Sequence, residues 1–245
     1  MQRKYELVMD DTIEVYGHIL YHIRALKNFC NIKEGDLGGY IEKTNNLSHA
    51  GDCWVYDNAC VWDNARVCGN ARVYGNACVW NNARVCGNAH VYDNARVCGN
   101  ARVYKNSEVH ENAIIRGNAR IYGNSEIFGH ASIFDNAKIY SAFVHDNAYI
   151  HDNACVHNDV FVYGSVELFD NADIKQNTDY FVIKGPGRNA EFVVSFRCND
   201  GFIKVKTWEF DGLLEEYEKM IKKMKTKYAK EYLAIVNLIK IHFSL

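Results

Sequence analysis

The chain has 245 residues, a length that suits one domain with appendages. Its 28 Lys and Arg residues nearly balance its 30 Asp and Glu residues, and the net charge of −2 gives no overall argument for nucleic-acid binding. No apolar run approaches the roughly 18 residues of a membrane span, and the polar start Met1–Glu6 does not resemble a signal peptide, so we expect no membrane association and a cytoplasmic location.

Residues 1–51 carry no repeat and predict short strands followed by a glycine-rich turn. The expected strands are Tyr5–Val8, Thr12–Tyr16 and Ile19–Ile23. The segment Gly35–Tyr40 predicts tight turns, and it lacks the Lys and Ser or Thr of a phosphate-binding loop. We expect this region to be an N-terminal β cap, because an uncapped solenoid exposes its core and its strand edges.

From Asp52 to Gln176 the chain repeats every six residues through 21 units, one of them a residue short. The fourth slot of each unit is aliphatic and the second is nearly always small, so both point inward in an extended chain. Gly, Asp and Asn at the unit ends suit tight corners. Three units would make one triangular coil, and 21 units about seven coils, roughly 30–35 Å long at a strand spacing of ~4.8 Å.

The order aliphatic, two variable residues, Asn, small, variable resembles the hexapeptide repeat of left-handed parallel β-helices. The resemblance implies left-handed coiling, whereas the general rule for parallel crossovers favours the right hand, and a right-handed β-helix is the alternative. The segments Gly17–Leu26, Gly35–Glu42 and Lys227–Leu233 also resemble uncharacterised hexapeptide-repeat proteins of phages and prophages. This likeness implies a phage-related setting without a settled activity.

Residues 177–245 break the repeat and predict an α+β region. The segments Phe192–Cys198 and Phe202–Trp208 flank an Asn-Asp-Gly turn, a pattern typical of a β-hairpin. Asp211 is the expected N-cap of a first helix, and apolar residues at helical spacing between Tyr228 and Phe243 predict a second. These helices could cap the solenoid or form a dimer.

The nine Cys residues form no Cys-x-x-Cys motif, and no zinc-ligand spacing occurs, so neither a metal nor another cofactor is expected. Cys60 and Cys78, like Cys68 and Cys86, lie one predicted coil apart. Their strand spacing would allow disulfides. We nevertheless expect thiols, because a cytosolic chain is kept reduced.

One predicted outward face is basic. Its charged residues recur every 18 positions: Arg66, Arg84, Arg102, Arg120 and Lys138. Beside them stand Cys68, Cys86, Tyr104, Tyr122 and Tyr140. Like charges on neighbouring strands repel, which favours an anionic counterpart: an acidic surface of a host protein, a nucleotide or a nucleic acid. The alternative is that repeat duplication multiplied arginine without a partner, since solvent screens such charges.

Trp62 and Trp80 are expected to form an exposed apolar strip on a second face. Such strips mark interfaces, so we expect a homodimer or homotrimer, or coverage by the terminal helices.

An enzymatic alternative follows from the many hexapeptide-repeat proteins that are acyltransferases with a catalytic His. His145, His151 and His157 occupy one outward slot on each of three faces and should not converge. His145 lies in the short unit Ala142–Asp146 and is a weak catalytic candidate. The preferred hypothesis is a non-enzymatic binding or scaffold protein that acts on a host protein or sequesters an anionic ligand; a structural or assembly role is a further alternative.

Overall fold

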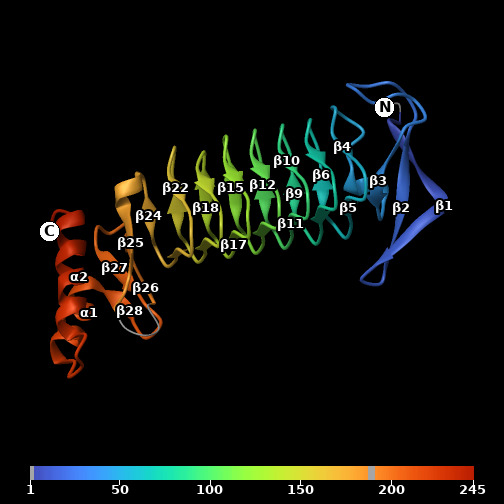
Figure 1. Ribbon diagram of the computed structural model, residues 1–245. Coiled ribbons are helices and arrows are strands. Elements are labelled where there is room, and N and C mark those ends of the chain that lie inside the picture. Colours follow the sequence, from blue (N-terminus) through green and yellow to red (C-terminus); the bar gives the residue numbers. More distant parts are fainter. Residues whose placement is uncertain (1–2, 187–190) are drawn as a thin grey trace.

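The computed structural model describes residues 3–186 and 191–245. Figure 1 shows an elongated stack of coils with strands packed at its N-terminal end and two helices at the other. The described residues contain no helix that is long and apolar enough to span a membrane.

Three parallel columns of seven short strands each form the coils, in the order expected for a period of six. The basic face consists of β6 (Arg66–Val67), β9 (Arg84–Val85), β12 (Arg102–Val103), β15 (Arg120–Tyr122), β18 (Lys138–Tyr140), β21 (Cys155–Val156) and β24 (Asp173–Ile174). The aromatic face consists of β4 (Trp54–Val55), β7 (Arg72–Val73), β10 (His90–Val91), β13 (Glu108–Val109), β16 (Glu126–Ile127), β19 (Phe143–Val144) and β22 (Phe161–Val162). The hairpin face consists of β5 (Cys60–Val61), β8 (Cys78–Val79), β11 (Arg96–Val97), β14 (Ile114–Ile115), β17 (Ser132–Ile133), β20 (Tyr149–Ile150) and β23 (Glu167–Leu168).

These columns confirm a parallel β-solenoid. The chain before β4 begins a further turn, because Leu47 pairs in parallel with Val67, so the solenoid has about eight turns. The inward Ala and aliphatic residues of the coils are buried, as the alternation predicts.

Asparagine ladders stabilise the corners between the faces. The side-chain amide of Asn70 donates to Asn88 Oδ1 at 3.0 Å, and that of Asn88 donates to Asn106 Oδ1 at 2.9 Å. Similar Asn stacks occur at the other two corners. The residue before each Asn adopts a positive φ, such as 70° at Gly69 and 54° at Asp93, which confirms the predicted corner chemistry.

At the N-terminal end, β1 (Tyr5–Val15) and β2 (His18–Ala25) form a hairpin closed by Tyr16 and Gly17. The two strands expected before Gly17 are one strand with a register shift between Val8 and Thr12. This hairpin extends the hairpin face, because β3 (Leu37–Ile41) joins β2 to β5.

The prediction of turns at Gly35–Tyr40 is wrong for its second half, since β3 lies there. A Cβ on Gly38 would lie 2.5 Å from the carbonyl oxygen of Val55, and one on Gly39 would lie 2.6 Å from that of Ala59. These glycines therefore permit close packing of β3 on the first coil. The short helix η1 (Thr44–Asn46) follows.

The C-terminal end is layered. After η2 (Asn177–Asp179) comes an antiparallel sheet in the order β25-β26-β27-β28. Its strands and the helices after them are β25 (Tyr180–Lys184), β26 (Phe192–Arg197), β27 (Ile203–Lys206), β28 (Asp211–Leu213), α1 (Leu214–Lys223) and α2 (Ala229–His242). Val194 and Phe196 pack toward the last coil, whereas Val193 and Val205 belong to a second core with the helices.

The expected hairpin and both helices are confirmed, but Asp211 is not the N-cap of α1. It lies in β28, and the helix begins after Leu213, whose backbone N–H donates to Glu216 Oε2 at 3.0 Å. The flanking strands β25 and β28 were not expected.

Candidate anion-binding face

The five basic residues stand in register on consecutive coils of the basic face. Arg66 pairs with Arg84, Arg84 with Arg102, Arg102 with Arg120, and Arg120 with Lys138. Their side chains project outward and are exposed or partly exposed. The column therefore exists as the 18-residue spacing predicts.

No acidic side chain of the described residues neutralises this column. Across residues 3–186 and 191–245, none of the five forms an ion pair with a carboxylate. Elsewhere in the same structure arginines do find partners, since Arg24 Nε lies 3.1 Å from Glu6 and Arg197 Nε lies 3.2 Å from Asp179. The basic face thus presents positive charge that only solvent or a partner molecule can offset.

The neighbouring tyrosines stack on one another along the coil axis. Ring centroids are 5.5 Å apart between Tyr104 and Tyr122 and again between Tyr122 and Tyr140, and His157 continues the stack at 5.7 Å. Rings at this spacing cover each other's faces. The inner tyrosines therefore offer ring edges and hydroxyl groups, not the open faces on which bases stack.

The stack ends at a disulfide between Cys68 and Cys86, whose Cα atoms are 4.7 Å apart. The expectation that both residues are thiols is wrong for this pair, which is bonded at a spacing that the parallel register allows. Cys60 and Cys78 are likewise paired on neighbouring coils, on the hairpin face, but they remain thiols. The hydrogen bond to Cys78, together with burial, raises the pKa of Cys60.

A hollow of about 480 Å³ lies at this end of the basic face. It is lined by Arg66, Arg84, both cysteines of the disulfide, Tyr104 and the segment 44–49. That segment folds back onto the first coil, where the backbone N–H of Ser48 donates to the carbonyl of Val67 at 2.9 Å. Sequence reasoning missed the hollow, because the non-repeating segment gave no sign of which face it would border.

His49 forms part of the same rim. Its ring stacks on Tyr5 at 4.5 Å, and its Nδ1 accepts a hydrogen bond from the backbone N–H of Lys4 at 3.2 Å. Burial, together with nearby Lys4, lowers the pKa of His49, which disfavours a positive charge on this ring.

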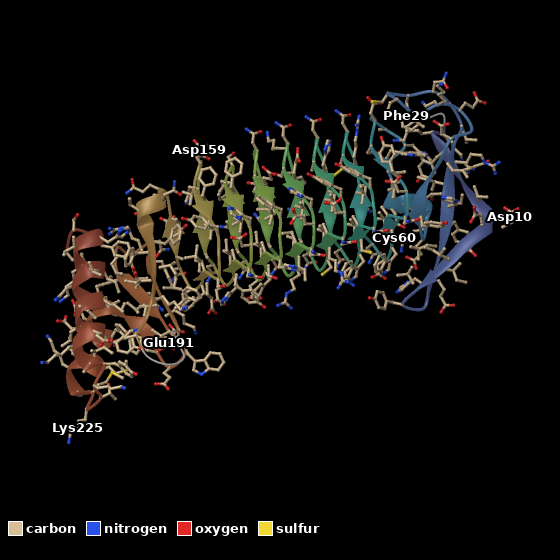
Figure 2. The ribbon with its side chains drawn as sticks, in the orientation of Figure 1. Asp10, Phe29, Cys60, Asp159, Glu191 and Lys225 are labelled. Carbon is tan, nitrogen blue, oxygen red and sulfur yellow. A yellow bond between two sulfur atoms is a disulfide. The ribbon has the colours of Figure 1, made fainter. Side chains whose placement is uncertain are left out.

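Trp62 is not the exposed residue that its slot predicts. Only 2% of it is exposed, and it packs in a cluster with Leu20 of the hairpin while stacking on Trp80 at 5.1 Å. Cys60, labelled in Figure 2, belongs to the same buried cluster. The expected cover was a second subunit or the terminal helices; the actual cover is the β1–β2 hairpin, whose Ile13 and Val15 face the strip.

The three histidines considered for catalysis lie on three different faces. His145 stacks between Phe128 and Tyr163, and its Nδ1 lies 3.3 Å from Asp146. His151 and His157 contact Glu167 and Asp173 on the other two faces. They therefore do not converge on one site.

One group of potential metal ligands is His18, Glu42 and Asp63. The two ring nitrogens of His18 contact different carboxylates: Nδ1 lies 2.9 Å from Glu42 and Nε2 lies 3.6 Å from Asp63. This geometry is that of a bridging histidine that anchors the hairpin, because a single ion would need one nitrogen and both carboxylates on the same side.

A match to a family model supports the repeat fold. The family described as YdcK β-solenoid repeat matches residues 65–80 and 95–111. Among solved structures, a Bacillus cereus protein described as a candidate acetyltransferase shares 12% identity, with 69% of this chain and 92% of that chain covered and a TM-score of 0.23. No curated protein matches the chain. The chain is a β-solenoid repeat protein, and similarity at this level carries no argument about activity.

Proposed function

We propose that the chain is a non-enzymatic binding or scaffold protein whose basic face binds an anionic partner. The observation that carries the proposal is the column of five cations in register, none with a carboxylate partner among the residues that the structure describes. Each directly opposed like-charge pair destabilises a sheet by roughly 0.2–1 kcal/mol, so the four neighbouring pairs together cost roughly 1–4 kcal/mol. A bound anion would offset that cost.

Repeat duplication alone accounts poorly for this column. In the same slot, the aromatic face carries Arg72, His90, Glu108 and Glu126 on successive coils. Copying a coil of 18 residues would have preserved that face as well as the basic one. Positive charge persists on one face while its neighbour changes sign, which supports a role for the basic face itself.

The partner is expected to present phosphate or carboxylate groups. Arginine binds both through paired N–H donors, and the outward tyrosine hydroxyl groups add further donors. An acidic surface of a host protein, a nucleotide or a nucleic acid has the required chemistry. If the resemblance to phage hexapeptide-repeat proteins holds, such binding would act on a host protein or withdraw an anionic ligand.

The test compares two double variants with equal changes in net charge. Arg102→Glu with Arg120→Glu reverses the centre of the basic face. Arg96→Glu with Arg116→Glu is the matched control, because both residues point outward from the hairpin face. The probes are single-stranded DNA, poly-glutamate and heparin, each titrated at several salt concentrations, since affinity for a polyanion falls steeply as salt rises.

We expect the basic-face variant to lose binding to at least one probe and the control to keep it. The probe that responds identifies the class of partner. If both variants bound every probe as the wild type does, or if no probe bound the wild type, the proposed function would be rejected.

A further inference from the structure

The stacked rings of the basic face end at Tyr104, which lines the hollow. Tyr104 contacts Tyr122 on one side, and within the described chain no ring contact occurs on its other side. The two preceding slots of the column hold Cys68 and Cys86, whose side chains are far shorter than a tyrosine. On the aromatic face, by contrast, the stacked rings continue through the corresponding coils as Tyr74 and Tyr92.

The missing rings leave an open recess. Along the column the segment 44–49 comes first, Cys68 and Cys86 occupy the next two slots and Tyr104 follows, and all of them line the hollow. Sulfur atoms pack favourably against aromatic rings, so the disulfide suits a flat aromatic group as well as the Tyr104 ring does. A planar ligand placed here would take the position that a tyrosine occupies on later coils.

Arg66 and Arg84 line the same recess from the strand slots beside the disulfide. They are adjacent cations of the column, one strand spacing of ~4.8 Å apart. Neither has a carboxylate partner among the described residues, so both guanidinium groups are available for paired hydrogen bonds to phosphate oxygens.

We propose that this hollow is a nucleoside phosphate site, in which the base stacks on Tyr104 above the disulfide and the phosphates bind Arg66 and Arg84. The proposal rests on the anion-binding role proposed for the basic face and narrows it to one end of that face. The volume of about 480 Å³ lies within the ~300–1,000 Å³ range of small-molecule sites. A longer strand of nucleic acid gains no further stacking, because the inner tyrosines already cover one another.

Isothermal titration calorimetry with the oxidised, full-length protein tests the site. The ligands are ADP and GDP. Adenosine, which has the base without phosphates, and pyrophosphate, which has the phosphates without a base, are the control ligands. We expect a diphosphate nucleoside to bind at least ten-fold more tightly than either control ligand. Tyr104→Ala should weaken binding by on the order of ten-fold, the effect of one stacked base, whereas Tyr163→Ala, at an exposed ring of the aromatic face, should not.

Filling the recess provides a second test. Cys86→Tyr would place a ring in the empty slot and should abolish nucleotide binding. Cys86→Ser removes the same disulfide without filling the slot, and it should retain most of the affinity. Arg84→Ala should weaken binding, while Arg96→Ala, at an outward arginine of the hairpin face, should have little effect.

The outcomes separate the two proposals. If pyrophosphate bound as well as ADP and Tyr104→Ala changed nothing, the site would be an anion site without base recognition, and the inference would be wrong while the basic face kept its role. If neither nucleotide bound, the inference would also be wrong, and the polyanion titrations would decide the proposed function independently.

Discussion

Two adjacent residues of β12 give opposite predictions for the same substitution. Val103 is 0% exposed and stacks in register between Val85 and Ile121. Val103→Asp removes a buried valine worth about 1.5–3 kcal/mol and leaves an unpaired carboxylate among aliphatic side chains, at a further cost of several kcal/mol. The sum approaches the whole stability of a typical domain, about 5–15 kcal/mol. We expect this variant not to fold.

Arg102→Asp should have almost no such effect. Arg102 points outward between Arg84 and Arg120, so an aspartate replaces two repulsive pairs with two attractive ones. Each pair loses a repulsion and gains an attraction of roughly 0.2–1 kcal/mol each, so the two pairs together change by about 1–4 kcal/mol, partly offset by the lower strand propensity of aspartate, on the order of 1 kcal/mol. The free energy of unfolding should stay constant or rise by up to about 3 kcal/mol at low salt, and the rise should shrink as salt is added.

Soluble yield and thermal unfolding followed by circular dichroism measure both effects. Val103→Thr is the milder variant if the aspartate protein cannot be purified, because its unpaired hydroxyl should cost about 1–3 kcal/mol. A soluble Val103→Asp protein with the wild-type melting temperature would refute the solenoid core. A large loss of stability in Arg102→Asp would refute the outward placement of the column.

Four further measurements test other parts of the structure. Trp62→Ala should lower the free energy of unfolding by about 3–5 kcal/mol in urea titrations. The control Trp208→Ala, at a residue that is 91% exposed, should change that free energy by less than about 0.5 kcal/mol. Equal effects of the two substitutions would mean that the hairpin does not cover Trp62. Reducing the Cys68–Cys86 disulfide, which spans 18 residues, should cost about 3 kcal/mol, and a melting temperature indifferent to reductant would contradict the bond. Burial raises the pKa of Tyr180 from 10.0 to about 12, so its contribution to stability is present below pH 10 and is lost as the pH rises toward 12. The Tyr180→Phe variant should therefore lose less stability than the wild type between pH 10 and 12, and an equal loss of stability would argue against this assignment. The homodimer or homotrimer remains a prediction, and light scattering that reports a monomer at high protein concentration would oppose it.

The coils could be predicted because the residue types within each six-residue unit determine which side chains point inward and where the chain turns. Ala101 and Val103 specify which side chains turn inward, and Asn100 marks the corner before them. No long-range information is needed, since each unit repeats the environment of the unit one coil earlier.

The end structures required information that no single unit contains. The glycines Gly38 and Gly39 are compatible with a turn and also with a strand packed closely on its neighbour. Only the position of the first coil decides which of the two structures forms. The exposure of Trp62 was inferred from its slot, but its cover comes from Leu20 and the hairpin around it, some 40 residues earlier in the chain. Such contacts depend on where non-repeating segments fold back.

The candidate site divides in the same way. The basic column follows from counting in steps of 18, and the sequence predicts it. The stacking of Tyr104 and Tyr122, the disulfide at Cys86 and the lining contributed by residues 44–49 depend on side-chain rotamers and on a segment outside the repeat. The residue types therefore predicted which side chains lie on the basic face, but not which of their faces are left accessible to a ligand.

Position within the coil, more than local sequence, decides what a residue of this solenoid can do. The hexapeptide Ala-Arg-Val-Cys-Gly-Asn occurs three times, beginning at residues 65, 83 and 95. The first two copies are 18 residues apart, so their arginines align on the basic face and their cysteines form the disulfide. The third copy is out of phase: Arg96 lies between Cys78 and Ile114 on the hairpin face, and Cys98 remains a free thiol. Identical sequences thus acquire different chemistry, and a binding site in this fold must be sought in the 18-residue alignment of slots and in the places where that alignment is broken.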